Sequence, residues 1–85
     1  INPQSAAAYF YRVFVYDAVK QYQNAAADMT KAIDLGLKTA LVFYSRGAVY
    51  MKINKSNEAT EDFKAAARLG SKEAMEYLKS KGVAW

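Results

Sequence analysis

The feature that most constrains this chain is an internal repeat with a period of 34 residues. When the sequence is compared with itself at that offset, ten of the 34 residue pairs that begin at Ala6 are identical, among them Arg12 with Arg46. Repeats of this length are typical of helical hairpins that stack in a row, because each hairpin buries its apolar face only against a neighbour. The sequence therefore predicts two such units, residues 6–39 and 40–73.

Within each unit the apolar side chains recur every three to four residues, which is the period of one helix face. The polar run at residues 54–57 interrupts this period, and Gly36 and Gly70 mark two further breaks, since glycine readily takes the left-handed conformation beyond a helix end. Ser71 is expected to cap the last helix. The helices predicted in this way are 5–18, 22–35, 39–52, 56–69 and 72–81.

Composition excludes several classes of protein. Aliphatic and aromatic residues make up 53% of the chain, which favours a packed core, and a single proline with four glycines supplies too few turns for an all-β fold. The chain has no cysteine and no histidine, which excludes disulfides and Cys- or His-based catalysis. We therefore expect no enzyme, no metal site and no cofactor.

The net charge of +4 comes from lysines and arginines scattered along the chain, without a block of like charges. Such scatter is typical of a solvated surface, so we expect no nucleic-acid partner. No apolar run reaches the roughly 18 residues that a membrane-spanning helix needs, so no membrane partner is expected either.

The 34-residue repeat resembles the tetratricopeptide repeat in its bacterial form. The first helix of that repeat carries an aromatic residue, a small residue and a tyrosine at the spacing of Phe43, Gly47 and Tyr50. The matching positions of its second helix are Ala59, Phe63 and Ala66. Gly47 is expected to face Ala59 so that the two helices approach closely, whereas the first unit departs from the pattern with Val13. The Leu-Gly-x-x-x-Ala joints are also similar to Sel1-like repeats.

The resemblance implies an all-α fold, a right-handed α-solenoid of antiparallel helix hairpins. The resemblance also implies that residues 1–5, before the first unit, are the remnant of a preceding repeat. Pro3 would correspond to the proline that follows the second helix of a repeat in this family. Residues 74–85 would form a C-terminal capping helix and tail.

In the tetratricopeptide family, ligands lie on a concave surface that is formed by the first helix of each hairpin. The resemblance therefore implies a peptide- or protein-binding surface made of Phe10, Tyr11, Phe14, Asp17, Leu41, Tyr44, Ala48, Met51 and Lys52. The last helix would add Met75, Leu78 and Lys79. The Lys and Asn with which some members bind a peptide carboxylate on this face are absent here, so that ligand is not predicted.

Two groups of residues allow two interpretations each. Phe10, Phe14 and Tyr44 are not required for the contact within a hairpin, so they form either an exposed apolar groove or a packing surface for a neighbouring repeat. Arg12 and Arg46 form either a ladder for an acidic ligand or internal ion pairs with the repeated aspartates. The ion pairs are favoured.

Two functions of different kinds follow from these patterns. The first is a scaffold that binds a protein or peptide on its concave face. The alternative is a structural module that assembles through open solenoid ends, either with another copy as a homo-oligomer or within a larger repeat protein.

Overall fold

A computed structural model describes residues 3–85 of the chain as five α-helices with no strand among them. The helices are α1 (Ala6–Ala18), α2 (Tyr22–Asp34), α3 (Ala40–Lys52), α4 (Ser56–Arg68) and α5 (Lys72–Ser80). Every predicted helix is present, and each observed end lies within one residue of the predicted one. The all-helical prediction is confirmed. Pro3 is described as part of a turn, while Ile1 and Asn2 of the predicted remnant lie outside the described residues.

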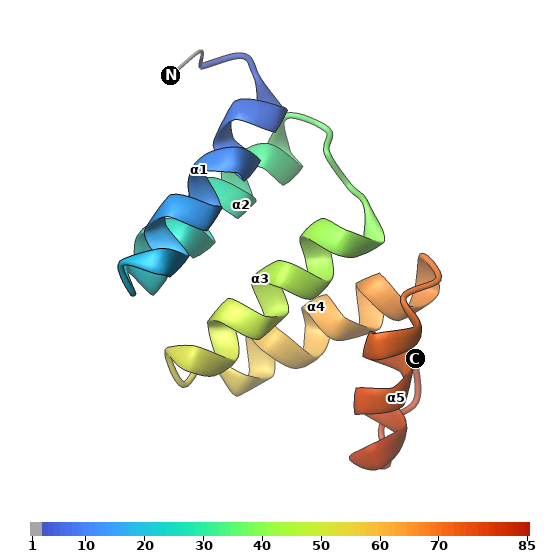
Figure 1. Ribbon diagram of the computed structural model, residues 1–85. Coiled ribbons are helices and arrows are strands. Elements are labelled where there is room, and N and C mark those ends of the chain that lie inside the picture. The colour runs from blue at the N-terminus through green and yellow to red at the C-terminus, as the bar shows by residue number, and fades with distance from the viewer. Residues whose placement is uncertain (1–2) are drawn as a thin grey trace.

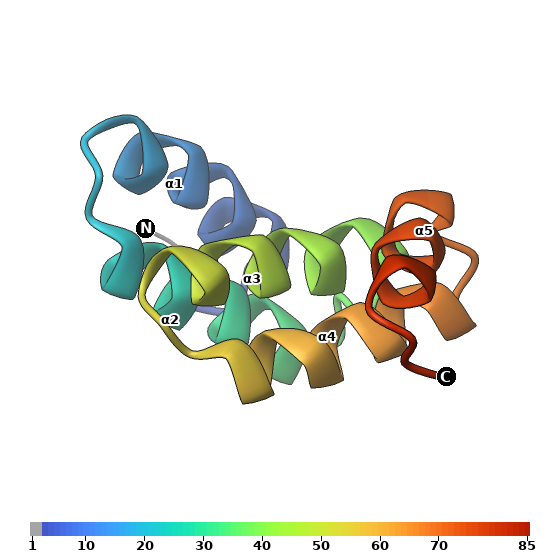
Figure 2. The same ribbon diagram turned by 90° about the horizontal axis from the view of Figure 1, so that it is seen from below.

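The helices form two layers in an elongated molecule of 40 × 24 × 16 Å. Figure 1 shows α1 running antiparallel to α2 and α3 antiparallel to α4, with α5 crossing the end of α4. Figure 2 shows α1, α3 and α5 on one side of the molecule and α2 and α4 on the other. The closest packing is therefore between helices that follow each other in the chain.

Helix ends recur with the period of the sequence. The connections inside the two antiparallel pairs each contain one non-glycine residue in the left-handed region, Lys20 at φ 61° and Asn54 at φ 62°. The connections after α2 and α4 contain Gly36 at φ 103° and Gly70 at φ 100°. Asparagine and glycine tolerate this region, whereas lysine is uncommon there, so the sequence alone did not indicate the conformation of Lys20.

Helices α1, α3 and α5 begin with a hydroxyl cap. The predicted cap at Ser71 is confirmed, because its Oγ accepts a hydrogen bond from the Ala74 amide at 3.1 Å. Ser5 accepts from the Ala8 amide in the same way at 3.1 Å, and Thr39 accepts from Val42 at 3.2 Å. Each of these bonds satisfies an amide that the helix itself cannot pair.

Two apolar clusters form the core and meet at α3. The first joins α1, α2 and α3 through Val13, Ala25, Ala26, Met29, Ile33, Val42 and Val49. The second joins α4 and α5 through Ala59, Phe63, Ala66, Ala67, Ala74 and Leu78. Phe43 and Tyr50 of α3 pack against both clusters, so aromatic residues fill the space between the two helix pairs as expected.

Gly47 lies at the tightest point between α3 and α4. A β-carbon added to it would lie 2.9 Å from Cε1 of Phe63 and 3.2 Å from the carbonyl oxygen of Ala59. The second distance involves backbone, which cannot rotate away. The expected contact between Gly47 and Ala59 is confirmed, and it explains why α3 has no side chain at this position.

Candidate functional site

A groove runs between α1 and α3, the two helices that the sequence predicted to carry the binding surface. Its walls enclose about 180 Å³ and consist of Val13, Phe14, Asp17, Tyr44, Ser45, Ala48, Val49 and Lys52. Five of the nine predicted site residues line it, namely Phe14, Asp17, Tyr44, Ala48 and Lys52. Most of the residues implied by the resemblance therefore lie on one continuous surface, and its role in binding stays a prediction.

The other four predicted residues lie outside this groove. Phe10 is half-buried and its ring packs edge-on against Phe14 at a centroid distance of 5.4 Å. Tyr11 and Leu41 are exposed on the surfaces of α1 and α3. Met51 is exposed near α5, where its sulfur accepts a hydrogen bond from the Tyr77 hydroxyl at 3.7 Å.

The interpretation that Phe10, Phe14 and Tyr44 are not required for the contact within a hairpin is wrong for Tyr44, and Phe10 is part of the core packing. The Tyr44 ring lies 5.4 Å from the Phe63 ring of α4, and Phe10 packs against the first core cluster. Only Phe14 is largely exposed, at 59%. Leu78, expected on the binding surface, is fully buried because α5 turns it toward α4. Phe14 is therefore the main apolar side chain that the groove offers to a ligand.

An ion pair connects the two walls of the groove. Nζ of Lys52 in α3 lies 3.2 Å from Oδ1 of Asp17 in α1, and the ammonium group also lies 4.9 Å from the centre of the Tyr22 ring. Both charged side chains remain nearly half exposed, so the pair adds little stability. It does neutralise the charge of the groove, which leaves an uncharged, mainly apolar surface between Asp17 and Tyr44.

The repeated arginines form internal ion pairs, as the favoured interpretation predicted. Arg46 binds both carboxylate oxygens of Asp62 at 2.8 Å, and Arg12 binds Asp28 in the same bidentate manner at 2.6 and 2.8 Å. Both aspartates are buried. Because each guanidinium group is already engaged, the arginines do not form a ladder for an acidic ligand.

Aromatic rings hold the Arg46 guanidinium on two sides. Its central carbon lies 6.0 Å from the Phe43 ring and 5.5 Å from the Tyr50 ring, and Nη1 donates to Oγ1 of Thr30 in α2 at 3.0 Å. Hydrogen bonding to Asp62 raises the pKa of Arg46, although burial opposes this effect. The arginine thus links α4, α3 and α2 at the junction of the two helix pairs.

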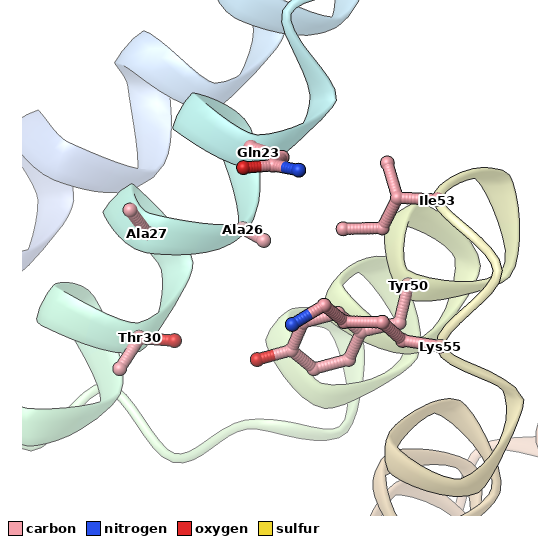
Figure 3. Close-up of a pocket in the computed structure, with 7 residues that line it drawn as sticks. All are labelled: Gln23, Ala26, Ala27, Thr30, Tyr50, Ile53 and Lys55. Atoms are coloured by element: carbon pink, nitrogen blue, oxygen red, sulfur yellow. The ribbon is translucent and has the colours of Figure 1, made fainter.

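A second hollow, of about 310 Å³, lies on the other side of α3. Figure 3 shows Gln23, Ala26 and Thr30 of α2 facing Tyr50 and Ile53 across it, and Ala27 and Lys55 complete its lining. The sequence did not indicate this hollow, because its residues come from different positions of the repeat. The only available signal was the spacing of the four α2 residues, which places them on one helix face.

Within residues 3–85, no group of three acidic side chains gathers closely enough to hold a metal ion. Over the same range, no helix combines the length and apolar character that crossing a bilayer requires.

No family model matches the chain, and comparison with curated proteins finds no match.

Proposed function

We propose that this chain is a protein-interaction module of the tetratricopeptide type, an α-solenoid without catalytic activity that binds a peptide or protein in the groove between α1 and α3. The fold part of this proposal is supported by features that recur at the 34-residue period. They include the bidentate Arg–Asp pair, the left-handed residue between paired helices and the glycine that follows each pair. Recurrence of backbone and side-chain geometry is what stacked repeats produce.

The groove itself carries the functional part of the proposal. Its neutral charge and the exposed ring of Phe14 suit an apolar side chain, and Ser45 and the Asp17–Lys52 pair supply polar groups around it. A volume of about 180 Å³ is close to the roughly 150 Å³ of a protein cavity that holds one benzene molecule. We therefore propose as ligand a peptide segment that inserts one aromatic or branched aliphatic side chain between α1 and α3.

Peptides selected for binding from a random display library test this proposal, with dissociation constants then measured by fluorescence anisotropy. Ala48→Arg fills the groove and should weaken binding at least tenfold, which corresponds to about 1.4 kcal/mol. Ala27→Arg makes the same change in the hollow on the other side of α3 and should leave affinity unchanged. If the selected peptides bind Ala48→Arg with the same affinity as the native chain, the groove is excluded as the binding surface.

A second candidate function, structural assembly, is favoured by the exposed face of α1. Val49 of α3 is buried at 5% against α2, whereas Val15, which is 34 residues earlier, is 62% exposed. Val19 is 58% exposed and its counterpart Ile53 is half-buried. The surface of α1 that corresponds to the α2-facing surface of α3 is thus uncovered, and another hairpin of the same kind could pack on it.

Molecular mass measured against protein concentration by sedimentation separates the two candidates. If the chain assembles through α1, its mass should rise above that of one chain as the concentration increases. The Val15→Asp variant should keep the mass of one chain at every concentration. Ala48→Arg, which changes the groove but not this face, should leave the mass unchanged. A constant monomer mass at high concentration would argue against self-assembly and leave peptide binding as the better account.

A further inference from the structure

We propose that the hollow between α2 and α3 binds a carboxylate group attached to a short apolar chain. This site is separate from the α1–α3 groove and does not depend on the function proposed for it. The inference comes from a difference between the two lysines near the carboxyl end of α3. Lys52, in the groove, is paired with Asp17 at 3.2 Å. The side chain of Lys55, at the hollow, has no hydrogen bond or ion pair within residues 3–85, and none of the residues lining the hollow is acidic.

Three of the residues that line the hollow carry hydrogen-bond donors, namely Lys55, Tyr50 and Thr30. In the view of Figure 3, the ammonium group of Lys55 and the hydroxyl of Tyr50 point toward α2, and the hydroxyl of Thr30 points from α2 toward Tyr50. The Thr30 oxygen already accepts a hydrogen bond from Arg46 at 3.0 Å, so its own proton is left to donate. The Tyr50 hydroxyl has no hydrogen-bond partner in the described part of the chain.

An ionised carboxylate only accepts hydrogen bonds, so it matches three donors and a single positive charge. A phosphate group carries more charge than one lysine can neutralise, and phosphate sites typically use arginine in a bidentate geometry. The only nearby arginine, Arg46, is already engaged by Asp62. A carboxylate is therefore the better match for this set of side chains.

The remaining walls of the hollow are apolar. Ala26 of α2 faces Ile53 across the space and is almost completely buried, and Ala27 also lines the hollow (Figure 3). The volume of about 310 Å³ is at the lower limit of ordinary small-molecule sites, which suits a branched chain of a few carbons. The same chemistry occurs in a small organic acid and at the C-terminal residue of a peptide.

Amide chemical shifts of the nitrogen-15-labelled chain test the site, with sodium isovalerate as probe and sodium chloride adjusted to keep the ionic strength constant. We expect saturable shifts confined to residues 23–30 and 50–56, with a dissociation constant on the order of 1–10 mM for so small a ligand. Isovaleramide has the same shape without the charge and should produce no saturable shift. If the amide binds as well as the acid, or if neither saturates, the proposal is wrong.

Three variants locate the charge contact. Lys55→Gln should weaken isovalerate binding about tenfold, since a charged hydrogen bond is lost, and Tyr50→Phe should weaken it about threefold. Lys52→Gln alters the other lysine and should have no effect. Both Lys55 and Lys52 are exposed, so these variants are expected to fold. Unchanged binding in Lys55→Gln would overturn the assignment.

Acetyl-Gly-Leu with a free C-terminus and its C-terminal amide distinguish the two sources of the carboxylate. Tighter binding of the free peptide than of isovalerate would indicate a peptide C-terminus, and weaker binding would indicate a small organic acid. Equal binding of the free peptide and its amide would contradict the carboxylate assignment.

Discussion

Replacing Asp62 with alanine is expected to lower the free energy of unfolding by about 3–5 kcal/mol, the usual cost of breaking a buried ion pair from one side. The Asp62 carboxylate is only 6% exposed and the Arg46 side chain 18% exposed, so the remaining guanidinium would lose both of its charged hydrogen bonds with little access to water. A domain of this length typically has about 4–13 kcal/mol of stability in total. Urea unfolding followed by circular dichroism measures the loss.

A double-mutant cycle shows whether the loss comes from the pair. Arg46→Ala should also be strongly destabilising, and the two substitutions together should cost clearly less than the sum of the single ones. Additive losses would contradict the pairing. Asp17→Ala is the matched control, because its exposed pair with Lys52 should contribute less than about 1 kcal/mol. The equivalent cycle for Arg12 and Asp28 should give a smaller coupling, since the Arg12 side chain is 39% exposed.

Replacing Gly47 with leucine is expected to cost about 1–3 kcal/mol through overpacking. The new β-carbon would lie 2.9 Å from the Phe63 ring and 3.2 Å from the Ala59 carbonyl oxygen, so α3 and α4 would have to move apart. For a domain of this size, each kcal/mol lowers the melting temperature by roughly 4–8 °C. Thermal unfolding followed by circular dichroism measures the shift.

Two further variants separate overpacking from other effects of the substitution. Ala7→Leu introduces the same side chain at an exposed position of α1 and should leave the melting temperature nearly unchanged. Gly47→Ala has two opposing effects, because alanine favours the helix by about 1 kcal/mol while its methyl group meets Phe63. The loss of melting temperature in Gly47→Ala should therefore be much smaller than in Gly47→Leu. A melting temperature unaffected by Gly47→Leu would contradict the close contact between α3 and α4.

The helices and their pairing contacts could be predicted because the signals for them are local or repeated. Helix ends follow from Gly36, Gly70 and the hydroxyl cap at Ser71, which act within a few residues. The pairing of Arg46 with Asp62 follows from a spacing that occurs twice in the chain. Repetition supplied the long-range information that a single sequence normally lacks.

Features that depend on contacts between different repeat positions could not be predicted. Tyr44 seemed free because the repeat pattern does not require it, yet the relative position of α3 and α4 brings its ring within 5.4 Å of Phe63. The hollow beside Lys55 combines the face of α2 with the end of α3 and the start of α4. Neither arrangement follows from helical periodicity, because the first depends on how α3 is placed against α4 and the second on how one helix pair is placed against the next.

The most direct test of the central claim is a map of the amide chemical shifts that change when a selected peptide is added to the labelled chain. Binding in the groove predicts that the largest changes occur on both of its walls, around Phe14 and Asp17 of α1 and around Tyr44 and Ala48 of α3. Changes concentrated on the opposite layer, in α2 and α4, would contradict the claim.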